Sequence, residues 1–296
     1  MIVDKGNEAH VHHALLYECQ DLSQAALDWQ GDCSYDDTMP LDLKGCNGGA
    51  PIAGWAIGGE DFWLPPNVGI RFGKTGGRFM LLETHYDNPD QFEGVVDSSG
   101  LRLWLTPNLR EHDASYIAVG PLVPTIIVPP FQQDFALSGL CTSECVSAAL
   151  KQAGQQSITV FASLLHAHLA GRSIKTTVIR NGKERAVLND NKLYDFNYQN
   201  YDMLKDQVTI TAEDSLNTTC GYPSAPLVGK KKPTSPLTRT VGLTVHILAT
   251  GTNALFGGNA REAHAHPNAR TDARAHVGTH AQVPHAKSAG RHGGRS

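Results

Sequence analysis

The short segment His166-Ala167-His168 holds the side chains best suited to chemistry in this sequence. On an extended strand, residues i and i+2 lie on the same face, about 6.6 Å apart along the backbone. Two imidazoles placed in this way can bind one metal ion through bonds of about 2 Å. The same pattern also occurs where two half-buried histidines bind nothing. His166 and His168 are therefore candidate metal ligands, and their assignment to a metal site depends on support from other histidines.

A second group of histidines lies near the start of the chain and at residue 85. His12 and His13 are adjacent, and adjacent residues of a flat strand face opposite sides. Both can bind one ion only if the backbone twists or bulges at this point. His10 lies one strand step before His12, and His85 ends an apolar run just before a turn. A chance cluster of surface histidines is the alternative interpretation.

Taken together, these histidines favour copper, because imidazole nitrogen suits this metal well, although it suits zinc equally. A four-thiolate zinc site would need two close pairs of cysteines, and Cys141 with Cys145 is the single close pair here. The six cysteines instead favour disulfides in an oxidising compartment. The sequon Asn217-Thr218-Thr219 agrees with a secreted glycoprotein.

Short apolar runs closed by turn signals predict that the histidines lie on β-strands. Residues 157–169, which include His166 and His168, are long enough for a helix. Their β-branched start and Gly171 favour a strand instead. Residues 176–180 followed by Asn181-Gly182 predict a hairpin. Further strands are predicted at residues 14–17, 79–86, 101–105 and 208–211.

The 296 residues are enough for two domains, and frequent Gly and Pro between short strands predict an all-β fold. We expect two consecutive antiparallel β-sandwich (jelly-roll-like) domains at residues 1–109 and 110–245, the second of them truncated. Residues 246–296 contain half of the 14 histidines and show no apolar periodicity. Their composition predicts a disordered C-terminal tail of low complexity.

Charge and hydropathy exclude several classes of protein. The chain has 25 Lys+Arg against 29 Asp+Glu, whereas a nucleic-acid binder would show a basic excess. No run of about 18 apolar residues occurs, so no transmembrane segment is expected. The N-terminus has no signal-peptide pattern. Combined with the predicted disulfides, this favours a protein of the secretory pathway or the extracellular space whose sequence here lacks its beginning.

Seven segments, in order and at compatible spacing between residue 8 and about 242, carry a family resemblance. They are HHALLYEC at 12–19, GWAIGG at 54–59, LETHYDNP at 82–89, NLREHDA at 108–114, GLCTSEC at 139–145, FASLLHAHLAGR at 161–172 and NTTCGY at 217–222. Together they resemble the copper type II, ascorbate-dependent monooxygenases. The likeness is closest to the branch of dopamine β-monooxygenase and the DBH-like monooxygenases.

The resemblance implies two β-sandwich domains that each hold one copper ion. It implies that His12, His13 and His85 bind the electron-transfer copper, and that His166 and His168 bind the oxygen-binding copper. His166 also matches a position assigned as catalytic in the family. Ascorbate would reduce both coppers, and O2 would hydroxylate a C–H bond of a small amine or peptide-like substrate with release of water.

The sequence departs from the family at the third ligand of the second copper. The family has a methionine there, in a Glu-Met-Cys stretch after the landmark at Cys220, and its soft sulfur favours Cu(I). All four methionines of this chain precede Cys220. We therefore expect impaired oxygen chemistry, with His246 as an alternative third ligand.

The resemblance also implies a pattern of disulfides. Cys19 would pair with Cys46. The four other cysteines would need partners outside this sequence or in the missing methionine stretch: Cys33, Cys141, Cys145 and Cys220. Loss of a native disulfide commonly costs about 2–5 kcal/mol, so the second domain is expected to be weakened.

Two alternatives remain open. A non-catalytic copper-binding protein would keep only the site of His12, His13 and His85 and would bind one copper per chain. A zinc hydrolase on a β-sandwich would need a carboxylate base near the histidine pair. Glu18 and Glu144 are distant candidates for that base.

Overall fold

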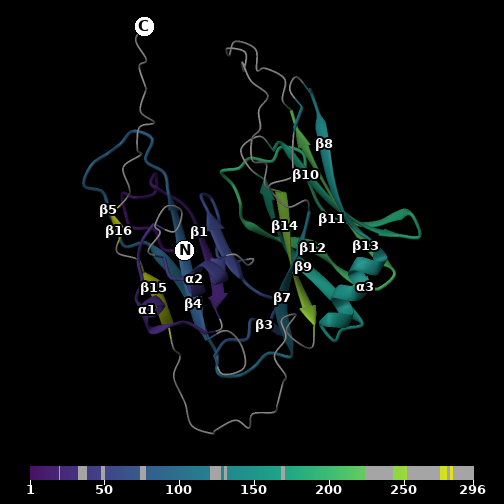
Figure 1. Cartoon of the computed structure of the whole chain (residues 1–296), viewed down its shortest axis with the longest axis horizontal. Coiled ribbons are helices and arrows are strands. Elements are labelled where there is room, and N and C mark those ends of the chain that lie inside the picture. The colour runs from purple at the N-terminus through teal and green to yellow at the C-terminus, as the bar shows by residue number, and fades with distance from the viewer. Residues whose placement is uncertain are drawn as a thin grey trace.

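The computed structural model describes residues 1–19, 21–32, 39–47, 51–73, 78–120, 128–129, 132–167, 171–223, 243–251, 274–278 and 281–282. Within these residues the chain is mostly β, with antiparallel sheets and three helices (Figure 1). The predicted fold class is confirmed in this respect. No helix in the described ranges is both long and apolar enough to cross a membrane.

The first part of the chain is built on a three-stranded sheet in the order β2-β1-β4. Leu16 of the central strand is buried and packs with Ile52 and Leu101. Two short strand pairs and two helices complete this part. The bounds are β1 Val11–Cys19, α1 Gln24–Leu27, α2 Leu41–Asn47, β2 Ala53–Ala56, β4 Phe79–Tyr86, β5 Val96–Asp97, β6 Gly100–Trp104, β15 Arg274–Gly278 and β16 Ala281–Gln282.

The second part consists of two sheets that share one hydrophobic core. The orders are β11-β10-β13-β8 and β12-β9-β14-β7-β3, and Figure 1 shows these strands grouped together with α3 at one end. The bounds are β3 Val68–Gly69, β7 His112–Val119, β8 Phe135–Cys141, α3 Ser143–Gln152, β9 Ser157–Ala167, β10 Ser173–Arg180, β11 Lys183–Asn191, β12 Tyr201–Thr211, β13 Asp214–Tyr222 and β14 Leu243–Gly251.

Strand β9 is buried on both of its faces. Leu165 and Ala167 belong to the core between the two sheets, whereas Ala162 and Leu164 pack with Tyr201 in a separate cluster that includes residues of the first part. A strand covered on both sides has a nearly continuous apolar sequence instead of an alternating one. The prediction of a strand over a helix at this place is confirmed.

The hairpin predicted at Asn181-Gly182 is also confirmed, because these residues connect β10 and β11. Asn181 has φ 51° and Gly182 has φ 71°, and a two-residue turn with both φ values positive matches the twist of the flanking strands. The turn therefore requires residues that adopt a positive φ with little steric strain, glycine above all.

The prediction that residues 246–296 form a disordered tail is wrong for part of this stretch. β14 lies between β9 and β7 and pairs antiparallel with both. β15 and β16 pair with β6 and β5. The start of β14 is rich in Thr, Val, Ile and Leu, which favour strands, and two neighbouring strands satisfy its backbone. The rest of the predicted tail lies outside the described residues.

The predicted division at residue 110 stays a prediction. β3 comes from before this point and pairs in parallel with β7, which comes after it. The five-stranded sheet therefore takes strands from both predicted domains.

The disulfides agree with the resemblance at one pair and differ at another. Cys19 is bonded to Cys46, as expected. Cys141 is bonded to Cys145 instead of to a partner outside the sequence. The chain turns after β8, where Thr142 caps α3, and this turn brings the two Cα atoms to 5.3 Å, which suits a disulfide. Cys220 is a buried free thiol, and Cys33 lies outside the described residues.

Opening each disulfide separately would test the role of loop length. The sequence separation is 27 for Cys19–Cys46 and 4 for Cys141–Cys145. In the chain-entropy model such loops correspond to about 3.5 and about 2 kcal/mol of stabilisation. We expect Cys19→Ser/Cys46→Ser to lower the free energy of unfolding in urea more than Cys141→Ser/Cys145→Ser does. A larger loss from the short loop would contradict this expectation.

Candidate metal centre

The backbone of β1 bulges at His12. Val11 lies opposite Tyr86 and His13 lies opposite His85, so His12 is an extra residue with no partner of its own in β4. A bulge of this kind places two residues against one and redirects a side chain. His13 and His85 form a cross-strand pair on one face of the sheet. The bulge that a shared ion requires is therefore present, and it brings His12 to the same place.

The ligand atoms of these three histidines converge. Nδ1 of His12 is 2.9 Å from Nδ1 of His13, and one ligand atom from each of His12, His13 and His85 lies within 4.8 Å of the others. With metal–nitrogen bonds of about 2 Å, two ligands of one ion lie about 3–4 Å apart. The three imidazoles can therefore hold one metal ion after small adjustments. Among the described residues, no carboxylate belongs to this cluster.

Burial and mutual proximity keep two of these imidazoles, those of His13 and His85, neutral. Burial, together with the nearby His85, His12 and His166, lowers the pKa of His13 to about 3. Burial and His12 also lower the pKa of His85, while Asp87 acts in the opposite direction. A neutral imidazole is the form that binds metal. At neutral pH, neither His13 nor His85 therefore has to lose a charge-carrying proton before binding.

His166 lies close to this cluster although it belongs to β9. It shares a face of the strand with Leu164, because alternate residues of a strand point to the same side. It contributes electrostatically to the lowered pKa of His13, so these two side chains are near enough to influence each other. Nδ1 of His166 is 2.5 Å from Oε1 of Gln199. His168 lies outside the described residues, so its pairing with His166 stays a prediction.

His10, the further candidate from the sequence, does not join the cluster. Its Nδ1 lies 3.2 Å from the carbonyl oxygen of Asp87, and its ring meets Phe92 edge-on. It is therefore a useful control for the three clustered histidines.

The loop between β11 and β12 was not predicted to take part, yet it contacts both groups of histidines. Phe196 stacks on His12 with ring centroids 5.8 Å apart. Oδ1 of Asn197 lies 3.0 Å from Nε2 of His12, and Gln199 contacts His166. The only sign of this role in the sequence is that amide side chains are interspersed with aromatic ones in residues 196–201. No motif or spacing connects residue 197 with residue 12.

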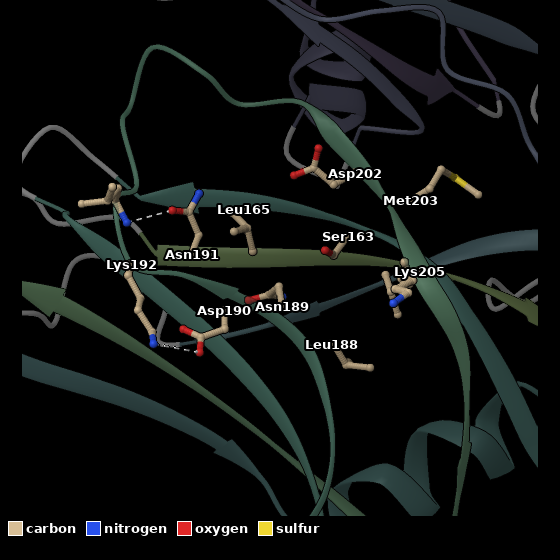
Figure 2. A pocket seen from close by; sticks show the side chains of 12 residues that line it. Ser163, Leu165, Leu188, Asn189, Asp190, Asn191, Lys192, Asp202, Met203 and Lys205 are labelled. Carbon is tan, nitrogen blue, oxygen red and sulfur yellow. Dashed lines mark hydrogen bonds and ion pairs between the residues drawn. The ribbon is translucent and has the colours of Figure 1, made fainter.

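A cavity of about 660 Å³ is lined by residues of β9, β11 and β12 and by none of the described candidate histidines (Figure 2). Ser163 and Leu165 line it from β9, and these residues alternate with Leu164 and His166. The cavity therefore lies on the opposite face of β9 from His166. Figure 2 shows Asp202 at its margin, and burial raises the pKa of this carboxyl group.

The lowered pKa of His13 predicts a fold that is sensitive to acid. The unfolded chain protonates His13 near its ordinary pKa of 6.5, whereas the folded chain does so only near 3. Between these values the unfolded state binds more protons, so stability falls as the pH decreases. We expect urea unfolding of the metal-free chain to show this loss, and His13→Gln to reduce it. His10→Gln is the control, and an unchanged pH slope in His13→Gln would contradict the expectation.

Comparison with models of protein families gives two matches that follow each other along the chain. The model "Copper type II ascorbate-dependent monooxygenase, N-terminal domain" matches residues 1–93. The model of the C-terminal domain of the same enzymes matches residues 112–234. The histidine cluster lies within the first match, and His166 lies within the second.

Curated proteins with similar sequences agree with these matches. The chain is 43% identical over 224 residues to "DBH-like monooxygenase protein 1" of Gallus gallus and 42% identical over 224 residues to its namesake of Homo sapiens. It is 38% identical over 223 residues to "Dopamine beta-hydroxylase" of Canis lupus familiaris. These alignments cover 75% of this chain and 35–36% of the relatives, so the chain spans about a third of their length.

Two matching solved structures have TM-scores of 0.19 and 0.20 to this chain. Latent PorU from Porphyromonas gingivalis matches with a TM-score of 0.19 and 10% identity, over 49% of this chain and 13% of that one. This likeness carries no argument about the fold. The family models and the curated relatives lead to one conclusion: the chain belongs to the copper type II ascorbate-dependent monooxygenase family.

Proposed function

We propose that the chain works as a copper- and ascorbate-dependent monooxygenase, which hydroxylates a C–H bond of a small amine or peptide-like substrate with O2. The observation that carries this proposal is the convergence of His12, His13 and His85 at a bulge, inside the segment that matches the N-terminal domain of this family. Three imidazole nitrogen donors without a carboxylate suit copper.

Bound copper would supply one-electron redox chemistry by cycling between Cu(I) and Cu(II). In the proposed reaction, one atom of O2 enters the C–H bond and the other leaves as water. Ascorbate provides the two electrons, and two protons are consumed. The chain itself holds three imidazoles in place, keeps His13 and His85 neutral, and covers the ring of His12 with Phe196.

We further propose that His166 and His168 hold a second copper and that His166 is a catalytic residue. The position of His166 supports this, because it lies on the face of β9 that packs toward the first part and comes near His13. No methionine follows Cys220, so a third, thioether ligand is absent from this chain. The oxygen chemistry of the second site is therefore proposed to be impaired.

One observation favours a second candidate function. In the described residues, the first group alone forms a cluster of three metal-binding side chains. A non-catalytic copper-binding protein that uses only this site is the corresponding proposal. A zinc hydrolase has less support, because the cluster includes no carboxylate that could serve as a base.

The organisation and location of the protein are also proposals. We propose two domains, at residues 1–109 and 110–245, each centred on one group of histidines. The disulfides Cys19–Cys46 and Cys141–Cys145 are typical of an oxidising compartment. They support a place in the secretory pathway or outside the cell.

Copper binding would test the first site directly. We expect the chain to bind Cu(I), measured by competition with a chelator, and His85→Ala to weaken this binding by about 100-fold or more, since a direct ligand contributes at least as much as its outer partners. His10→Ala should leave the affinity unchanged, because His10 lies outside the cluster. Equal losses in both variants would count against the site.

Turnover would separate the candidate functions. The chain is loaded with copper and incubated with ascorbate, labelled O2 and a panel of small amines and short peptides. Hydroxylated product that carries one labelled oxygen and disappears in His166→Ala supports the monooxygenase. One bound copper without product supports the copper-binding protein. Tight zinc binding with hydrolysis that needs no ascorbate would refute both.

A further inference from the structure

We propose that the segment Asp195–Gln199 is a positioning element shared by both groups of histidines, which selects the ring nitrogen that His12 and His166 offer to metal. This inference rests on the proposed copper function and deepens it. The segment connects β11 with β12, and its side chains reach His12 through Asn197 and His166 through Gln199.

The amide of Asn197 has one orientation. Its Nδ2 donates to Oδ1 of Asp195 at 2.9 Å, and its backbone N–H donates to the same oxygen at 2.9 Å. Its carbonyl oxygen Oδ1 therefore faces Nε2 of His12 at 3.0 Å. Because this oxygen can only accept, the hydrogen must be on Nε2 of His12. Nδ1 is then the unprotonated nitrogen of the neutral ring, and this atom is the one that lies 2.9 Å from Nδ1 of His13.

The amide of Gln199 is oriented in the same way but selects the other nitrogen. Gln199 is buried, and its Nε2 donates to the carbonyl oxygen of Phe196 at 2.7 Å. Its Oε1 therefore accepts from Nδ1 of His166. The hydrogen is on Nδ1, so Nε2 of His166 is the unprotonated nitrogen, which is the form that can bind metal. One short segment thus keeps Nδ1 of His12 and Nε2 of His166 unprotonated.

The segment is anchored on both parts of the chain. The hydroxyl of Tyr194 donates to the carbonyl oxygen of Ala167 and accepts from its N–H, both at 2.9 Å. At the other end, Tyr201 donates to the carbonyl oxygen of Pro51 at 2.7 Å, and Oδ1 of Asn200 accepts from the N–H of Ala56 at 2.8 Å. The first anchor is next to His166, and the others hold the last residue of β2 and the chain just before this strand, which pairs with β1.

Such outer partners matter for metal binding because they fix the tautomer and the orientation of a ligating imidazole. Without Asn197, the ring of His12 could carry its hydrogen on Nδ1, which would block the nitrogen that faces His13. Phe196 stacks on this ring but cannot distinguish the two nitrogens. The amide oxygen is therefore the group that makes the selection.

Nuclear magnetic resonance of the metal-free chain would show the tautomers without any turnover. Long-range 1H–15N spectra of labelled histidines, recorded at a pH where they are neutral, report which ring nitrogen carries the hydrogen. We expect Nε2–H for His12 and Nδ1–H for His166, with signals assigned by His12→Gln and His166→Gln. Asn197→Ala should turn His12 alone into a mixture of tautomers, and Gln199→Ala should do so for His166 alone. Gln199→Glu keeps an accepting oxygen and should retain the tautomer of His166.

Copper affinity supplies a second readout with a matched control. Asn197→Ala should weaken Cu(I) binding at the first site by about 10–100-fold. Asn191→Ala removes the same kind of side chain next to this loop, where its Oδ1 accepts from the backbone N–H of Leu193 and not from a histidine of the described residues, and should leave the affinity unchanged. Equal losses in the two variants would show an effect of folding and overturn the positioning role.

The two proposals fail in different ways. Absence of copper binding by the unaltered chain would refute the proposed function. Normal copper binding, together with tautomers that do not change in Asn197→Ala and Gln199→Ala, would overturn only the role of this segment. A hydrogen on Nδ1 of His12 in the unaltered chain would overturn it as well.

Discussion

The packing of the outer face of β9 against the first part of the chain is the contact on which the candidate site depends. Phe161, Ala162 and Leu164 of β9 lie in one buried cluster, against which Phe62 and Leu64 of the first part pack. Phe161 is fully buried, and burial of one such side chain contributes roughly 1.5–3 kcal/mol. Because His166 follows Leu164 on the same face of the strand, the contact turns it toward the first part, where it acts electrostatically on His13. It also brings the loop between β11 and β12 over both groups of histidines.

The first site combines a local irregularity with a shared environment. The bulge at His12 interrupts the pairing of β1 with β4, which leaves part of the ladder without its regular hydrogen bonds. As a result of the bulge, two adjacent imidazoles meet a third one across the sheet. Burial then disfavours the protonated forms of His13 and His85. Metal binding and folding are coupled in such a site, since the ion binds the neutral, converged rings of the folded state.

Much of the fold could be predicted because its signals are local. Side-chain type and turn chemistry predict the strand at residues 79–86, the hairpin at Asn181-Gly182 and β9, the strand that is buried on both faces. β14 was missed because the predicted tail of biased composition begins at residue 246, inside the strand. Pairing with β7 and β9 supplies stability that the sequence of β14 alone does not show. The pairing of Cys141 with Cys145 was missed because it depends on the turn into α3.

The sequence by itself determined the family, the mostly β class and the histidines that could bind copper, since these follow from residue types in a recognisable order. Only the tertiary structure decided how those histidines act together. The bulge between Val11 and His13 places adjacent residues on one face. Asn197, 185 positions away from His12 in the sequence, was found only there. The physical reason is that a hydrogen bond between distant residues depends on how the sheets pack, and packing across such a separation leaves no periodic pattern in the chain.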